Sequence, residues 1–359
     1  MSKAAELAAL IGSQTAQSNR NLIINGAMNV AQRGTSATGL GDSTVGYNTL
    51  DKYRLQKAGS PTARYTMTQD SNAPDGFANS LKVEVTTADT SPAANDHQYI
   101  DQFIEAQNLQ QLAWDTSSNG KRVTLSFYVK CSIAQTFAVD FINEDNSRYY
   151  NTTYTVSSAD TWERKTINLP ADASNGFNDD NGRGLRVRWT LLAGSDYTGG
   201  SVSTSWSGTL GRAANHENTW VGATGRTWQL TGVQLEVGDV ATPFEHRSFA
   251  DELLRCQRYF QVVGNETYFA GNGVGSANIA TGIPLGTPMR AAPSVPDTGY
   301  VFHRSGNTNS GTNSVTSVTY NNIGSSNLQL RVNFGSGISD EVAYVLKSQT
   351  ADLQLSAEL

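Results

Sequence analysis

Apolar and polar residues alternate along much of the chain, so that every second side chain belongs to the same face. The alternation is regular in SLKVEV (80–85), FAVDF (137–141) and LRVRWTLL (185–192), as is typical of strands with one face in a core and one in water. Turn-rich segments separate these stretches, and no comparable helical pattern interrupts residues 50 to 225. We therefore predict a central antiparallel jelly-roll sandwich over residues 51–247.

The same period of two returns near the end of the chain, in LQLRVNF (328–334) and DEVAYVLKS (340–348). Residues 263–359 are long enough for a second, smaller core. We predict a C-terminal β-sandwich there, so the expected fold class is mainly β.

Between these regions one predicted strand changes phase. Trp228 and Leu230 share one phase, whereas Val233 and Leu235 share the opposite one. A bulge at Thr231–Gly232 would let both halves face the core, and we expect it to turn the strand around a corner between two sheets.

After Pro243 the pattern becomes helical, and we predict a short linking helix over residues 248–262. Ser248 can cap its N-terminus, with Asp251 three residues later. The residues expected on its apolar face are Phe249, Leu253, Cys256 and Phe260. This helix would join the two β regions.

The first residues also carry a helical stripe, formed by Ala4, Leu7 and Ile11. A helix of about ten residues is marginal alone in water and needs a partner. We predict that residues 1–20 form an anchor or trimerisation helix, with a frayed terminus as the alternative. The Gly-, Ser- and Thr-rich residues 21–50 are expected to form a connecting arm.

Composition excludes some partners. Only 16% of the 359 residues are charged and the net charge is −6, whereas nucleic-acid binding needs concentrated Lys and Arg. No stretch of 18 apolar residues and no secretory signal are present, so we expect neither membrane insertion nor export by a signal. Cys131 and Cys256 lack metal-ligand spacing, and we predict a buried thiol at Cys131 and no disulfide.

Three segments resemble a family of bacteriophage virion fibre proteins, frequent in phages of marine and photosynthetic bacteria. They are NRNLIINGAMNVAQRGTS (19–36), DNGRGLRVRWTLLAGSDYTGG (180–200) and LTGVQLEVGDVATPFEHRSFADELLRCQRYFQ (230–261), and the ending TADLQLSAEL closes a C-terminal β domain in relatives. The resemblance implies a central region similar to jelly-roll carbohydrate-binding modules. It also implies a virion location after assembly in the host cytoplasm.

The expected partners follow from the resemblance. The protein would be a homotrimer, joined to other tail or capsid proteins through its N-terminus, with the C-terminal domain facing a host-surface carbohydrate. Trimerisation would protect sheet edges and raise the effective concentration of weak sugar sites. Two alternatives stay open: a head or tail decoration protein without ligand, and a glycan-degrading enzyme of the tailspike type.

Candidate glycan ligands are aromatic residues among turn-forming polar residues, namely Trp206, Tyr197 and Trp220. Trp189 and Trp228 are in phase with apolar neighbours and are predicted to be core. Asp179, Asp180 and Asn181 supply clustered oxygen atoms, and jelly-roll modules of the resembling type often hold a structural calcium. A plain turn is the alternative, because Asn and Asp favour turns without a metal.

We predict no catalytic site. GDST at residues 41–44 is similar to an esterase nucleophile block but no Asp-x-x-His pair follows, and the four histidines form no zinc motif. The sequence shows no repeat of the length expected for a β-helix depolymerase. Asp140, Glu144 and Asp145 remain candidates for glycoside hydrolysis, because that chemistry depends on the separation of carboxylates in space.

Overall fold

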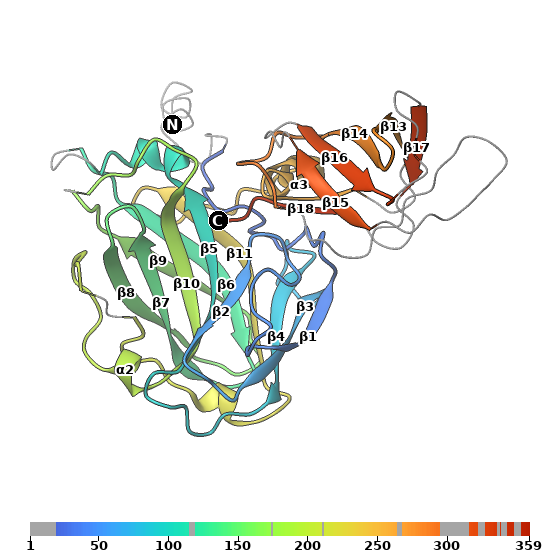
Figure 1. Cartoon of the computed structure of the whole chain (residues 1–359). Coiled ribbons are helices and arrows are strands. Elements are labelled where there is room, and N and C mark those ends of the chain that lie inside the picture. Colours follow the sequence, from blue (N-terminus) through green and yellow to red (C-terminus); the bar gives the residue numbers. More distant parts are fainter. Residues whose placement is uncertain are drawn as a thin grey trace. The chain divides into compact units, whose positions relative to one another are not determined.

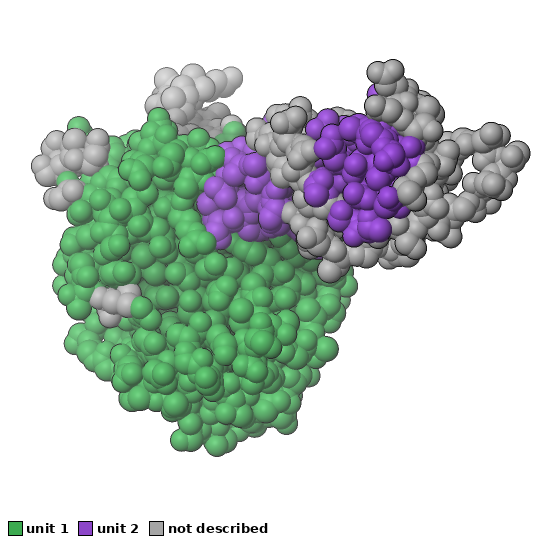
Figure 2. All heavy atoms as spheres, in the orientation of Figure 1, with its two compact units in different colours: residues 1–252 green, residues 253–359 purple. Residues whose placement is uncertain are grey.

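The computed structural model describes residues 19–114, 119–173, 175–209, 212–263, 268–294, 316–321, 327–335, 338, 343–347 and 353–359. The chain divides into two compact units, Met1–Glu252 and Leu253–Leu359 (Figure 2). Each unit is described by itself. The predicted anchor residues Ala4, Leu7 and Ile11 lie outside the described residues, so that prediction stays open.

Unit 1 is an antiparallel β-sandwich of two sheets (Figure 1). The six-stranded sheet has the order β1-β3-β4-β11-β6-β9, with bounds β1 Ser36–Leu40, β3 Arg64–Asp70, β4 Ser80–Thr87, β11 Thr227–Val237, β6 Val123–Cys131 and β9 Glu163–Leu169. The five-stranded sheet has the order β2-β5-β10-β7-β8, with bounds β2 Arg54–Ala58, β5 His97–Glu105, β10 Arg183–Ala193, β7 Gln135–Asn143 and β8 Arg148–Val156. The predicted mainly β fold is confirmed.

Short helical turns complete unit 1. They are η2 Ala106–Leu112, α2 Ser195–Thr198 and η3 Thr219–Gly222. No helix in the described part of the chain is both long and apolar enough to cross a membrane.

The core of unit 1 lies between the two sheets and follows from the alternation. Leu81, Val83, Phe137 and Val187 are buried in one apolar cluster. Trp189 and Trp228 belong to the same cluster with 0% of their surface exposed, as the sequence predicted. Cys131 is also buried there as a free thiol, and burial raises its pKa to about 11.

The predicted bulge in β11 is present. The pairing of β11 with β6 shifts register between Thr231 and Gln234, and Gly232 has φ of +60°. Leu230 before the bulge and Val233 after it are both buried. The expected corner between sheets is wrong, because both halves of β11 pair with the same strand, β6. The bulge therefore changes which alternate residues of β11 point into the core, while the strand stays in one sheet.

Residues 19–50 are part of unit 1, and the expected connecting arm is wrong for them. Ile23, Met28, Leu40 and Leu50 are buried in the core cluster, and β1 pairs with β3. The apolar residues of this segment are spaced irregularly among polar ones. They form no strict alternation, so the pattern carried no sign that they are buried.

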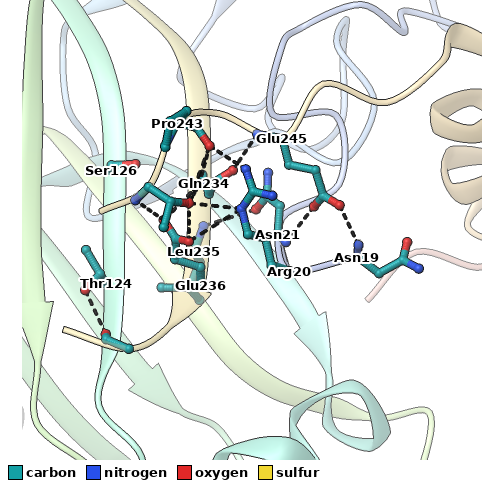
Figure 3. Close-up of polar contacts among 12 residues, drawn as sticks. Asn19, Arg20, Asn21, Thr124, Ser126, Gln234, Leu235, Glu236, Pro243 and Glu245 are labelled. Atoms are coloured by element: carbon teal, nitrogen blue, oxygen red, sulfur yellow. Dashed lines mark hydrogen bonds and ion pairs between the residues drawn. The ribbon is translucent and has the colours of Figure 1, made fainter. Parts of the chain in front are cut away.

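The start of this segment is clasped by residues that follow β11 (Figure 3). The Glu245 carboxylate accepts hydrogen bonds from the backbone N–H groups of Asn19 at 2.5 Å and Asn21 at 2.8 Å. Arg20 Nε donates to Thr242 Oγ1 at 2.9 Å and lies 3.7 Å from a Glu236 oxygen. Burial opposes ionisation of Glu245, but the Asn21 N–H and nearby Arg247 hold its pKa below the ordinary value. We call these contacts the N-terminal clasp.

The linking helix is α3, Phe249–Gln257, and it contains the boundary between the units. Ser248 caps it as predicted, since the Asp251 N–H donates to Ser248 Oγ at 3.1 Å and Ser248 Oγ donates to Asp251 Oδ2 at 2.7 Å. The helix is shorter than expected, because Phe260 begins strand β12. Phe249 is 59% exposed, so the expected apolar face is wrong at this residue.

Unit 2 contains two sheets in its described part. A two-stranded sheet pairs β12 Phe260–Val263 with β18 Leu353–Ser356. A five-stranded sheet has the order β15-β16-β14-β13-β17, with bounds β15 Ser317–Asn321, β16 Asn327–Asn333, β14 Asn278–Pro284, β13 Tyr268–Val274 and β17 Ala343–Lys347. Its core includes Ile279, Leu330, Val332 and Leu355.

Candidate functional site

The outward face of the five-stranded sheet carries a network of charged side chains. Leu55, Ile100, Val139 and Val187 point into the core, so their neighbours on each strand point outward. We call this surface the arginine face and define it by Arg54, Tyr99, Asp101, Phe103, Asp140, Arg186 and Arg188. Residues of three adjacent strands, β2, β5 and β10, meet there with β7 beside them.

Asp101 is the centre of the network. Its carboxylate accepts two hydrogen bonds from Arg54, each at 2.9 Å, and two from Arg186, at 2.8 and 2.5 Å. The Asp101 side chain is 0% exposed, whereas those of Arg54 and Arg186 are 13% and 12% exposed. The carboxylate raises the pKa of both guanidinium groups, in spite of the opposing effect of burial. Both arginines are therefore fixed in position with their charge retained.

A second pair lies on the next positions of β10 and β7. Arg188 Nε lies 2.8 and 2.7 Å from the two oxygens of Asp140, and their side chains are 4% and 1% exposed. Burial raises the pKa of Asp140, and the Arg188 guanidinium opposes that rise. Such a buried pair is costly to break, because either partner alone would be an uncompensated charge.

The guanidinium groups lie over the rings of two aromatic residues, Phe103 and Tyr99. Phe103 lies 4.6 Å from the guanidinium carbons of Arg54 and Arg183 and 5.0 Å from that of Arg186. Tyr99 lies 4.7 Å from Arg188 and 5.1 Å from Arg186. Cation–π contacts of this kind hold the plane of a guanidinium. Arg54 and Arg186 also donate to Asp101, and Arg186 to Glu144. The face thus presents guanidinium groups in fixed positions and no open aromatic ring.

One end of the arginine face is covered by residues 194–209 and 212–218, which we call the covering loop. Ser207 forms two backbone hydrogen bonds with Tyr149 of β8, at 2.8 and 3.1 Å, and Ser203 N–H donates to Asn151 O at 2.8 Å. Tyr197 stacks on His97 with ring centroids 4.8 Å apart.

The three aromatic residues proposed as sugar ligands differ in exposure. Trp206 is 5% exposed and donates from Nε1 to Pro170 O at 2.8 Å. Trp220 is 0% exposed, donates to Leu191 O at 2.6 Å and stacks on Tyr65. Both rings belong to the core cluster, so their burial contradicts the prediction that Trp206 and Trp220 are glycan ligands. Tyr197 is half-buried in the covering loop.

The proposed calcium ligands lie in an exposed turn. Asp180 Oδ1 accepts from the Gly182 N–H at 2.8 Å, as in an ordinary Asx turn. Asp179, Asp180 and Asn181 are exposed. Among the described residues, no group of three or more His, Cys, Asp or Glu side chains is placed to hold a metal ion. Calcium binding at this turn stays a prediction.

The carboxylates considered for hydrolysis each have a structural partner. Asp140 is buried against Arg188, Glu144 lies 3.4 Å from Arg186, and Asp145 accepts from the Asn178 side chain at 2.7 Å. A buried, doubly bonded Asp140 does not reach a glycosidic bond, because both of its oxygens face Arg188.

The arginine face does not follow from the hydrophobic pattern of the sequence. Its signal is present in LRVRWTLL, where Arg186 and Arg188 alternate with buried residues, and in Asp101 and Asp140 at outward positions of neighbouring strands. The pairing of strands was needed to bring these positions together.

No protein-family model matches the sequence, and no curated protein matches it either. Among solved structures, the enzymatically active domain of tailspike protein 4 of bacteriophage CBA120 is similar at 10% identity and a TM-score of 0.31, over 61% of this chain. That match spans only 21% of the tailspike chain. A family 11 carbohydrate-binding module from Clostridium thermocellum is similar at 10% identity and a TM-score of 0.29, covering 58% of this chain and 99% of the module.

A family 30 carbohydrate-binding module is similar at 12% identity and a TM-score of 0.27, covering 62% of this chain and 96% of the module. Identities and TM-scores of this size define no shared ligand or activity. The β-sandwich class is established by the strands and sheets of the protein itself.

Proposed function

We propose that the protein is a bacteriophage virion component, a tail fibre or similar appendage, in which unit 1 attaches to a glycan of the host surface. The arginine face is the binding surface in this proposal. The observation that carries it is the fixed position of Arg54 and Arg186, whose guanidinium groups share one fully buried carboxylate and rest on Phe103.

Glycans present many oxygen atoms that accept hydrogen bonds. Donors that are already held in place lose little conformational freedom when they bind, which raises affinity for a shallow ligand. A sheet surface is also more rigid than a loop, so the spacing of its donors is constant. Binding energy at each site would remain modest, and several chains in one appendage would raise it through multivalency.

The N-terminal residues have the attachment role in this proposal, with three chains aligned through Ala4, Leu7 and Ile11. A variant that lacks residues 1–18 keeps the N-terminal clasp, which begins at Asn19. We expect it to fold and to be absent from particles. Particles that contain the truncated chain at normal level would contradict the anchor role.

Binding to host cells and to a glycan array tests the attachment role. Arg54→Lys keeps a charge opposite Asp101 but loses the two-pronged contact, and we expect binding to fall about tenfold. Lys82→Gln is the matched control, because Lys82 lies on the outward side of β4 in the other sheet. A protein that binds no glycan and no host cell would support the alternative of a decoration protein without ligand.

A further inference from the structure

The two ends of the covering loop, near Tyr197 and near His216, lie against a small apolar cluster of their own. Tyr197 packs on Ala138, Ala193 and Ala213, which form a cluster separate from the main core of unit 1. Alanine side chains bury little apolar surface, and the hydrophobic contribution to stability scales with that surface. Polar contacts between the loop and the sheet therefore decide whether these ends stay closed.

Two histidines fasten the loop to the sheet, one from each side. His97 of β5 is held between Tyr99 and Tyr197, with ring centroids 4.7 and 4.8 Å away. His216 of the covering loop accepts a hydrogen bond through Nδ1 from the Ala138 N–H of β7 at 3.2 Å. Both residues are buried, with 0% of His97 and 6% of His216 exposed.

The contacts of both rings require the neutral form of histidine. The Ala138 N–H can only donate, so His216 Nδ1 carries no proton, and a protonated ring would place two donors against each other. His97 Nε2 lies 3.2 Å from Thr190 Oγ1, and its Nδ1 has no hydrogen-bond partner in the described part of the chain. A proton on that nitrogen would be buried without an acceptor. The closed loop therefore disfavours the charged form of each histidine.

The cationic groups around the rings act in the same direction. Burial holds the pKa of His97 well below its ordinary value, and the groups that add to this effect are Arg188, His216, Arg212 and Arg186. Burial also lowers the pKa of His216 to about 3. Both rings are therefore neutral at pH 7 while the loop is closed.

The carboxylates of this region have partners of their own. Asp140 is bound by Arg188 and also acts electrostatically on Arg212. The Glu217 carboxylate, next to His216 in the chain, accepts from the Thr136 N–H at 2.6 Å. Neither carboxylate is hydrogen-bonded to a histidine ring in these contacts, so a proton taken up by a ring is not neutralised by a direct partner.

We propose that the covering loop is an acid-opened lid: protonation of His97 and His216 releases its ends from β5 and β7 while the sandwich stays folded. Above pH 6.5 the rings are neutral in the open and in the closed state, and the loop stays closed. As the pH falls, the open state takes up protons that the closed state excludes, so opening becomes more favourable. Opening uncovers the end of the arginine face that the loop covers. This device goes beyond the proposed glycan binding and does not depend on it.

Hydrogen exchange of the full chain at pH 7.5, 6.0 and 4.5 tests the proposal. Each rate is divided by that of an unstructured peptide at the same pH, which leaves the opening constant. The N–H groups to follow are those that join the loop to β7, Ala138 and Glu217. Since the His216 pKa is about 3 in the closed state, we expect their opening constant to rise about 100-fold or more from pH 7.5 to 4.5. They should exchange faster than the N–H groups of β11 at every pH.

Matched variants assign the effect to the histidines. His216→Gln keeps an acceptor for the Ala138 N–H and does not titrate, so the rise should shrink by about 100-fold. His97→Phe keeps a ring against Tyr197, and the rise should also shrink in this variant. Glu217→Gln keeps an acceptor for the Thr136 N–H and should show the wild-type rise.

Three results would overturn the proposal. The first is an opening constant of the wild type that does not change with pH. The second is a rise that disappears in Glu217→Gln and persists in both histidine variants, which would assign it to the carboxylate. The third is exchange of the loop and of β11 at equal rates at pH 4.5, which would mean that unit 1 unfolds as a whole. The first and third results come from the wild type alone, and none of the three bears on glycan binding.

Discussion

The two outward faces of unit 1 hold ion pairs that differ in their exposure to solvent. On the six-stranded sheet Lys82 pairs with Asp70 and Glu84, and these carboxylate side chains are 24% and 40% exposed. On the five-stranded sheet the paired carboxylates of Asp101 and Asp140 are 0% and 1% exposed. Solvated pairs contribute little to stability, whereas buried ones are expensive to form and to break. The carboxylates of Asp101 and Asp140 are therefore held more firmly than those that pair with Lys82.

The largest expected effect is loss of the buried Asp140. Asp140→Ala leaves Arg188 charged and unpaired, and we expect the free energy of unfolding to fall by about 3–5 kcal/mol. Urea denaturation of this variant beside Asp70→Ala measures the contrast, since the half-buried carboxylate of Asp70, which contacts water, should change stability by less than about 1 kcal/mol. The double variant Asp140→Leu/Arg188→Met should recover most of the loss. Similar losses in the two single variants would abolish the distinction between the faces.

The next effect is a dependence on pH that comes from the covered end of the arginine face. Burial lowers the pKa of His216 from 6.5 to about 3, so the unfolded chain takes up the proton first as the pH falls. Its contribution to stability is present above pH 6.5 and is lost from pH 6.5 toward 3, by about 1.4 kcal/mol per unit at most.

Between pH 6.5 and 4.5 the free energy of unfolding of the wild type should fall because of His216. We expect the fall to be smaller by roughly 2–3 kcal/mol in His216→Gln. A glutamine oxygen can replace His216 Nδ1, which accepts from the Ala138 N–H at 3.2 Å. Thermal unfolding at several pH values measures the slope, with Lys82→Gln as reference. An unchanged slope would show that His216 does not titrate with unfolding.

A smaller effect is expected at a tightly packed glycine of the six-stranded face. Gly232 has φ of +60°, and an added Cβ would lie 2.7 Å from Phe77 Cζ and 2.9 Å from Tyr128 Cδ2. Gly232→Ala should destabilise unit 1 by about 1–3 kcal/mol through backbone strain and overpacking. Gly225→Ala shares the positive φ, at +78°, but meets nothing within 4 Å. Chemical denaturation should place the Gly225 variant closer to wild type, and the reverse order would refute the steric cause.

The smallest effect is expected at the solvated pair itself. Lys82→Gln should change the free energy of unfolding by less than about 0.5 kcal/mol, because the pair is exposed and competes with water. Denaturation in low and in 1 M NaCl should give nearly the same value for wild type and variant. A loss above 1.5 kcal/mol would mean that the six-stranded face is also organised by charge.

Much of the sandwich could be predicted from local pattern. Alternation located the strands that hold Leu81, Val139 and Val187, and the phase change at Gly232 located the bulge. The cap at Ser248 was also readable, because a capping contact involves residues three apart. These features depend on neighbours in sequence.

The arginine face and the burial of Trp206 and Trp220 depend on contacts across long separations. Arg54 meets Asp101 across 47 residues, and Arg186 meets the same carboxylate across 85. A tryptophan among Ser, Thr and Gly residues has the same local signature whether it is exposed or folded back onto Pro170. Only the pairing of strands decides between these outcomes.

The N-terminal clasp has a consequence for synthesis on the ribosome. Leu22 N–H donates to Leu235 O at 2.8 Å, and at translation rates of about 5–20 residues per second the acceptor emerges roughly ten to forty seconds after the donor. During that interval Ile23 and Met28 lack the surface that will bury them. The segment that is synthesised first therefore reaches its place in unit 1 only after β11 has been made. A nascent chain interrupted before residue 245 lacks the carboxylate that accepts from the N–H groups of Asn19 and Asn21.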